Sequence, residues 1–133
     1  MKLKLYLIAL ISFLAIDSLW LGLVAPKFYR SQIGHLMAET PNLFPAGIFY
    51  LLFIFGLVLF VIEPGLANPS FGNAVLRGAL FGLVTYATYD LTNQATLAGW
   101  PVLLTIVDLL WGTFLSAVVT GISVWSGKRL KST

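Results

Sequence analysis

The chain has 133 residues, of which 59% are hydrophobic and 10% charged, and its mean hydropathy is +0.92. A soluble domain is about half apolar and about one quarter charged, and a core of this size could not bury so much apolar surface, so a soluble globular protein is excluded. The absence of cysteine excludes disulfides, redox dithiols and thiolate metal sites. The net charge of +3 is not arranged as a basic stripe with interleaved aromatics, so we expect no nucleic-acid partner.

Four stretches are long and apolar enough to cross a bilayer as helices, which takes about 20 residues. They cover residues 3–24, 44–62, 78–96 and 101–125. The first has Lys2 and Lys4 at its start, as a signal peptide would, but it is longer than a signal sequence and contains Asp17, so we expect it to remain in the mature protein. The sequence therefore predicts an all-α membrane protein of one domain, residues 1–133, with four transmembrane helices in an antiparallel bundle.

Basic residues predict the orientation of these helices, because Lys and Arg are enriched in short cytoplasmic loops. With both ends of the chain in the cytoplasm, more basic residues lie on the inner side than on the outer side. The inner residues are Lys2, Lys4, Arg77, Lys128, Arg129 and Lys131, and the outer residues are Lys27 and Arg30. We therefore expect a multi-pass protein with cytoplasmic N and C termini.

The segment between the first two stretches, residues 26–42, has an amphipathic pattern. Tyr29, Ile33 and Met37 fall on one helical face, with the charged residues off it. This spacing predicts a short helix that lies in the outer interface of the membrane. The alternative is an ordinary connecting loop.

Three aspartates lie inside the predicted spans, where a charged side chain costs at least about 2.5 kcal/mol. Counting along each helix places Asp17, Asp90 and Asp108 in the outer half of the membrane, with no basic residue at their depth. Trp20 and Trp111 each follow an aspartate by three residues, so each indole shares a helical face with a carboxyl group. Such carboxyl groups cannot all be ionised unless a cation neutralises them.

The third predicted helix is the most polar, and its polar residues share a stripe. We predict that the first, third and fourth helices converge on a pocket, whereas the second, rich in phenylalanine and without charge, faces lipid or packs against the others. The predicted pocket residues are Asp17, Trp20, Tyr86, Tyr89, Asp90, Asn93, Asp108 and Trp111. The loop residues His35, Arg30 and Lys27 either cap this pocket or remain in solvent.

This arrangement has several interpretations. The carboxyl groups are interhelical hydrogen-bonding groups, a proton or cation site for transport, a binding pocket for a lipid or small molecule, or acid–base groups of an enzyme. The sequence contains no nucleophile motif, Gly-rich phosphate loop or His-rich metal motif, which favours binding over catalysis and implies neither a metal nor a cofactor. A hard cation such as Mg²⁺ would suit three carboxylates chemically, although the usual ligand spacing is missing.

Three segments, residues 13–22, 86–93 and 99–101, resemble an uncharacterised membrane protein family, domain of unknown function 2177. The most specific is Tyr-Ala-Thr-Tyr-Asp-Leu-Thr-Asn at residues 86–93. The resemblance covers nearly the whole chain and implies a four-helix protein of the bacterial inner membrane, but no established activity.

The function predicted from these observations is a membrane protein whose acidic pocket opens to the outer side and binds or passes a proton, cation or small amphiphile. Its expected partners are the lipid bilayer and, for transport, a second copy of the chain, since four helices line a path poorly. The alternatives are a membrane enzyme or accessory in lipid modification, and a structural subunit whose aspartates hold the helices in register.

Overall fold

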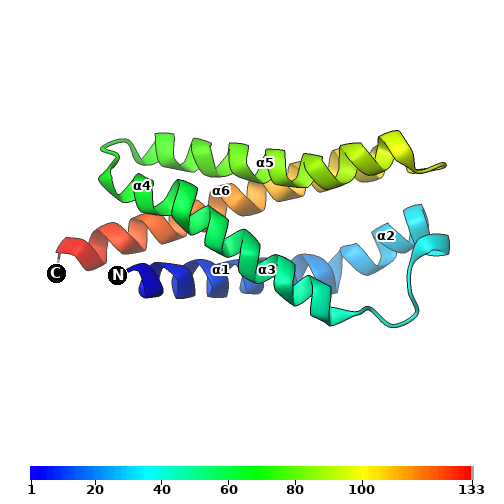
Figure 1. The fold of residues 1–133 in the computed structure, drawn as a ribbon, viewed down its shortest axis with the longest axis horizontal. Helices are drawn as coiled ribbons and strands as arrows, with labels where there is room; N and C mark the ends of the chain where they lie inside the picture. The colour runs from blue at the N-terminus through cyan, green and yellow to red at the C-terminus, as the bar shows by residue number, and fades with distance from the viewer. Residues whose placement is uncertain (133) are drawn as a thin grey trace.

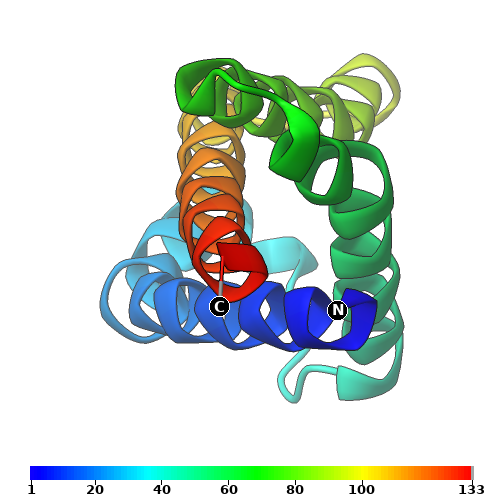
Figure 2. The same ribbon diagram turned by 90° about the vertical axis from the view of Figure 1, so that its left-hand side faces the viewer.

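The computed structural model describes residues 1–132, and within that range the chain is helical and has no strand. The elements are α1 (Lys2–Leu23), α2 (Ala25–Ile33), the 3-10 turn η1 (Gly34–Leu36), α3 (Leu43–Leu57), the π-helical segment η2 (Val58–Ile62), α4 (Glu63–Ala67), α5 (Phe71–Thr96) and α6 (Val102–Ser132). The long helices run along one common direction, and both chain termini lie at the same end of the bundle (Figure 1). Seen from that end, α6 passes between α5 and α1, while α3 lies on the other side of the bundle (Figure 2).

The predicted spans differ from the observed helices mainly at their ends. α5 begins at Phe71 rather than near residue 78, because the Ser70 side chain caps it by accepting a hydrogen bond from the Asn73 backbone N–H at 3.1 Å. α6 continues to Ser132. The second span continues through η2 into α4, and Pro64, which lacks a backbone N–H, falls in the first turn of α4.

Within residues 1–132, three helices are long and apolar enough to cross a membrane: Lys2–Leu23, Leu43–Ala67 and Val102–Ser132. The predicted fourth span, α5, is long enough, but it carries charged and amide side chains that make it less apolar. These are Asn73, Arg77, Asp90, Asn93 and Gln94. Of the four spans predicted from the sequence, three therefore have the length and composition of a membrane-crossing helix.

The apolar core occupies the half of the bundle near the chain termini. Its α1 residues are Leu5, Ala9 and Phe13, which are fully buried at intervals of four. They pack with residues of α3, η2 and the second half of α6. In the other half of the bundle, polar and aromatic side chains predominate between the helices.

Small residues allow α5 and α6 to pack very closely. A Cβ atom added at Gly78 would overlap the Thr120 side chain, and one added at Gly82 would overlap the Gly112 carbonyl oxygen and Ser116. Small residues at helix interfaces permit this approach in membrane proteins. The α5–α6 hairpin is the rigid support from which Asp90 and Asp108 project.

We expect Gly82→Ala to destabilise the protein by about 1–3 kcal/mol, because its Cβ would meet a backbone carbonyl that cannot rotate away. The matched control is Gly72→Ala on the same helix, where a Cβ has nothing within 4 Å. Thermal unfolding of both variants in lipid nanodiscs measures the difference. Equal melting temperatures would contradict the close α5–α6 packing.

Candidate functional site

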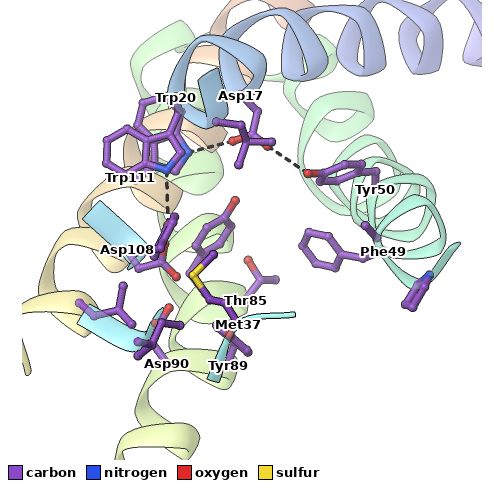
Figure 3. Close-up of a pocket in the computed structure, with 17 residues that line it drawn as sticks. Asp17, Trp20, Met37, Phe49, Tyr50, Thr85, Tyr89, Asp90, Asp108 and Trp111 are labelled. Carbon is purple, nitrogen blue, oxygen red and sulfur yellow. Dashed lines mark hydrogen bonds between the residues drawn. The ribbon is translucent and has the colours of Figure 1, made fainter. Parts of the chain in front are cut away.

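A cavity of about 730 Å³ lies in the half of the bundle away from the chain termini, lined by side chains from α1, α2, α3, α5 and α6 and from the loop after η1. Acidic, aromatic and aliphatic side chains surround it (Figure 3). The lining residues are Asp17, Trp20, Leu21, Tyr29, Ile33, Met37, Pro45, Ala46, Phe49, Tyr50, Thr85, Tyr86, Tyr89, Asp90, Leu104, Asp108 and Trp111. Its volume lies within the range of small-molecule pockets, about 300–1,000 Å³.

Asp17 joins three helices by hydrogen bonds. Its carboxyl group, on α1, accepts a bond from Trp111 Nε1 of α6 at 3.1 Å and one from the Tyr50 hydroxyl of α3 at 3.3 Å (Figure 3). The side chain is only 6% exposed. Asp17 therefore links helices distant in the sequence.

Asp108 is held in a second set of polar contacts. It is 7% exposed and accepts a hydrogen bond from the Tyr29 hydroxyl of α2, which itself accepts one from Trp20 Nε1 at 3.4 Å. Burial and the nearby Asp108 carboxyl raise the pKa of Tyr29, so its hydroxyl stays a neutral donor. The Trp20 and Trp111 rings stack between the two sets, with centroids 4.6 Å apart and planes at 12°.

Asp90 differs from the other two aspartates. It is 0% exposed, and neither carboxyl oxygen has a hydrogen-bond partner anywhere in residues 1–132. The Asp108 carboxyl group lies within hydrogen-bonding reach of it, so the two acids can share a proton. Buried polar atoms in folded proteins are nearly always paired. A bound group could therefore pair with this carboxyl group only once the neighbouring side chains shift, because neither oxygen is exposed to the cavity in this structure.

The cavity carries no basic side chain among the residues that the structure describes. The predicted caps Lys27, Arg30 and His35 are exposed and lie outside the lining. Helical spacing explains the two on α2, because Tyr29 and Ile33, four residues apart, turn the same face inward. Asn93 is half-buried and also lies outside the lining. The structure brings the other predicted pocket residues together: Asp17, Trp20, Tyr86, Tyr89, Asp90, Asp108 and Trp111.

The second predicted span packs in the core, as expected, but it also lines the cavity. Its helix, α3, contributes Pro45, Ala46, Phe49 and Tyr50 to the cavity, and Tyr50 donates to Asp17. One signal for this role was present in the sequence, because Tyr50 is the sole polar side chain of the predicted span 44–62. The aliphatic lining residues Leu21 and Leu104 were not predicted, because nothing distinguishes them from the other leucines of the spans.

The aspartates share the cavity without forming one compact cluster. Within residues 1–132, no group of three or more His, Cys, Asp or Glu side chains is close enough to hold a metal ion. Asp17 has its own donors, whereas Asp90 and Asp108 neighbour each other. The arrangement offers one unpaired carboxyl group in an aromatic enclosure.

These features define an all-helical membrane protein with a partly open cavity that is both acidic and aromatic. The chain belongs to the family described as predicted membrane protein (DUF2177), which matches residues 2–125. No curated protein and no solved structure matches it.

Proposed function

We propose that the protein is a four-span binding protein of the bacterial inner membrane, with cytoplasmic termini. Three spans have the length and composition required. α5 is the fourth, since it packs along α6 and its polar residues Asp90 and Tyr86 turn inward to the cavity. The basic residues at the end with the termini support this orientation. The amphipathic helix α2 then lies at the outer interface.

We propose further that the cavity binds a small amphiphile that enters from the outer half of the membrane. The single observation behind this proposal is the pair of unpaired oxygens on fully buried Asp90 at the wall of a 730 Å³ cavity. A proton or bare ion would occupy little of that volume, whereas a molecule with one polar group and an apolar body would use both the carboxyl group and the aromatic walls.

A structural role is the second candidate, and it is favoured for Asp17 and Asp108. Both carboxyl groups accept hydrogen bonds from other helices, as residues that set helix register do. Asp90 makes no such bond within the described residues. We therefore assign the register role to Asp17 and Asp108 and ligand binding to Asp90. No observation favours the enzymatic alternative in lipid modification.

Filling the cavity tests the binding proposal. We expect Ala46→Trp, whose side chain would enter the cavity, to prevent thermal stabilisation of the protein by compounds with a phenylbutyl body and a small head group. The matched control is Ile48→Trp, two residues along α3 at an exposed position outside the lining. Thermal unfolding in nanodiscs, with and without each compound, measures the effect. Equal stabilisation of both variants, or none in the unsubstituted protein, would contradict the proposal.

A further inference from the structure

We propose that the ligand of this cavity is an organic monocation, an ammonium group on an apolar body, and that Asp90 pairs with its charge. The inference rests on the proposed binding function and specifies the chemical class of the ligand. It is drawn from the charge, the aromatic surfaces and the unpaired polar atoms of the cavity.

The charge of the lining favours a cation. Carboxyl groups come from α1, α5 and α6, and no Lys, Arg or His of the described chain lines the cavity with them. An anionic ligand such as a fatty-acid carboxylate would lose its hydration and find no positively charged partner among the lining residues. A cation would instead supply the opposite charge that these carboxyl groups lack.

The aromatic side chains favour an organic cation over a metal ion. Rings from several elements line the space: Trp20, Tyr29, Phe49, Tyr50, Tyr86, Tyr89 and Trp111. Ring faces attract alkylammonium groups, and aromatic enclosures are the usual sites for quaternary ammonium ligands. A hard metal ion needs six or more oxygen ligands, whereas no three-carboxylate cluster exists in residues 1–132.

The hydrogen bonds identify Asp90 as the group that pairs with the ligand. Asp17 and Asp108 already accept bonds from neighbouring helices, so their charge is met by donors of the protein. Asp90 is buried and unpaired in the described chain. It follows Tyr86 by one turn of α5, and in Figure 3 it lies at the edge of the site beside Tyr89. This single carboxyl group without a donor could pair with a single positive charge on the ligand.

Aliphatic residues define where the apolar body of the ligand would lie. Leu21 of α1, Ile33 of α2 and Met37 of the following loop are among the lining residues. Their surface offers nothing polar, so it suits a hydrocarbon or aromatic body rather than a hydrated cation. The ligand class is therefore an amphiphilic amine.

The test compares three compounds that share the phenylbutyl body. One carries a trimethylammonium head, the second replaces its nitrogen by carbon and is neutral, and the third carries a carboxylate. Binding to the protein in nanodiscs is followed by tryptophan fluorescence, to which the cavity residues Trp20 and Trp111 contribute two of the four indoles. We expect the ammonium compound to bind at least about tenfold more tightly than its carbon isostere, and the carboxylate to bind most weakly.

Two variants identify the residue responsible. Asp90→Asn should bring the affinity for the ammonium compound down to that for the carbon isostere, while the affinity for the isostere stays unchanged. Glu39→Gln removes a carboxylate from an exposed position outside the cavity and should change neither affinity. If Asp90→Asn does not fold, the comparison of the three compounds on the unsubstituted protein still decides the charge preference.

The outcomes separate this inference from the proposed function. Equal affinity for the ammonium compound and its isostere, both abolished by Ala46→Trp, would overturn the charge preference and leave the binding function standing. A charge preference that survives in Asp90→Asn would overturn the assignment to Asp90. If none of the compounds binds at a site that Ala46→Trp blocks, both proposals are overturned.

Discussion

Asp17→Ala will destabilise the folded protein by about 2 kcal/mol, whereas Asp90→Ala will leave its stability nearly unchanged. The first substitution leaves Trp111 Nε1 and the Tyr50 hydroxyl without their acceptor in a buried site. The second removes a carboxyl group that has no hydrogen-bond partner in residues 1–132, so it leaves no donor unpaired. Both remove the same atoms from a buried aspartate, which makes the two variants mutual controls.

Reversible unfolding in mixed micelles measures both stabilities. Trp111→Phe, which removes the indole donor but retains an aromatic side chain, should reproduce part of the loss seen for Asp17→Ala. The two losses should not add in the double variant, because they remove the same hydrogen bond. An equal loss in Asp17→Ala and Asp90→Ala would mean that all three aspartates act as register-setting groups, which would remove the case for a ligand.

The meeting of Asp17, Asp90 and Asp108 at one cavity follows from helix geometry. Each residue of a helix rises by about 1.5 Å, so the sequence separation from a helix end sets the depth. Antiparallel helices with short connections then bring residues of equal depth to one level. The α5–α6 turn is short, with Gly99 at a φ of 75°, and this fixes the relative depth of Asp90 and Asp108 closely.

The partners of the aspartates could not be predicted in the same way. They depend on the rotation of each helix about its axis, and the long helices here are apolar on nearly every side, so no hydrophobic stripe reveals the inward face. For this reason the sequence pattern assigned Tyr50 to a helix that faces lipid or packs against the others. In the structure its hydroxyl group donates a hydrogen bond to Asp17. The sequence places Tyr29 on one helical face with Ile33 and Met37, but its bond to Asp108 depends on how α2 folds back over the bundle.

Binding of the phenylbutyl trimethylammonium compound will tighten as pH rises and then level off. Its charge does not titrate, so any pH dependence belongs to the protein. The acidic groups around Asp90 are Asp17 and Asp108, and the tyrosines of the cavity are Tyr29, Tyr50, Tyr86 and Tyr89. Tyr29 stays protonated because burial and Asp108 raise its pKa, so we expect the pH dependence to come from Asp90, the group that pairs with the ligand.

A proton and an organic cation compete for the same carboxyl group. At low pH the cation must displace the proton before it can pair with Asp90, and this weakens binding by up to about tenfold per pH unit. At high pH the carboxyl group is already ionised, so affinity becomes constant. Titrations by tryptophan fluorescence across the pH range measure the slope. The affinity of the Asp90→Asn variant for the ammonium compound should not change with pH. The affinity of the unsubstituted protein for the neutral isostere should not change with pH either. A slope that persists in Asp90→Asn would show that Asp17 or Asp108 receives the charge instead.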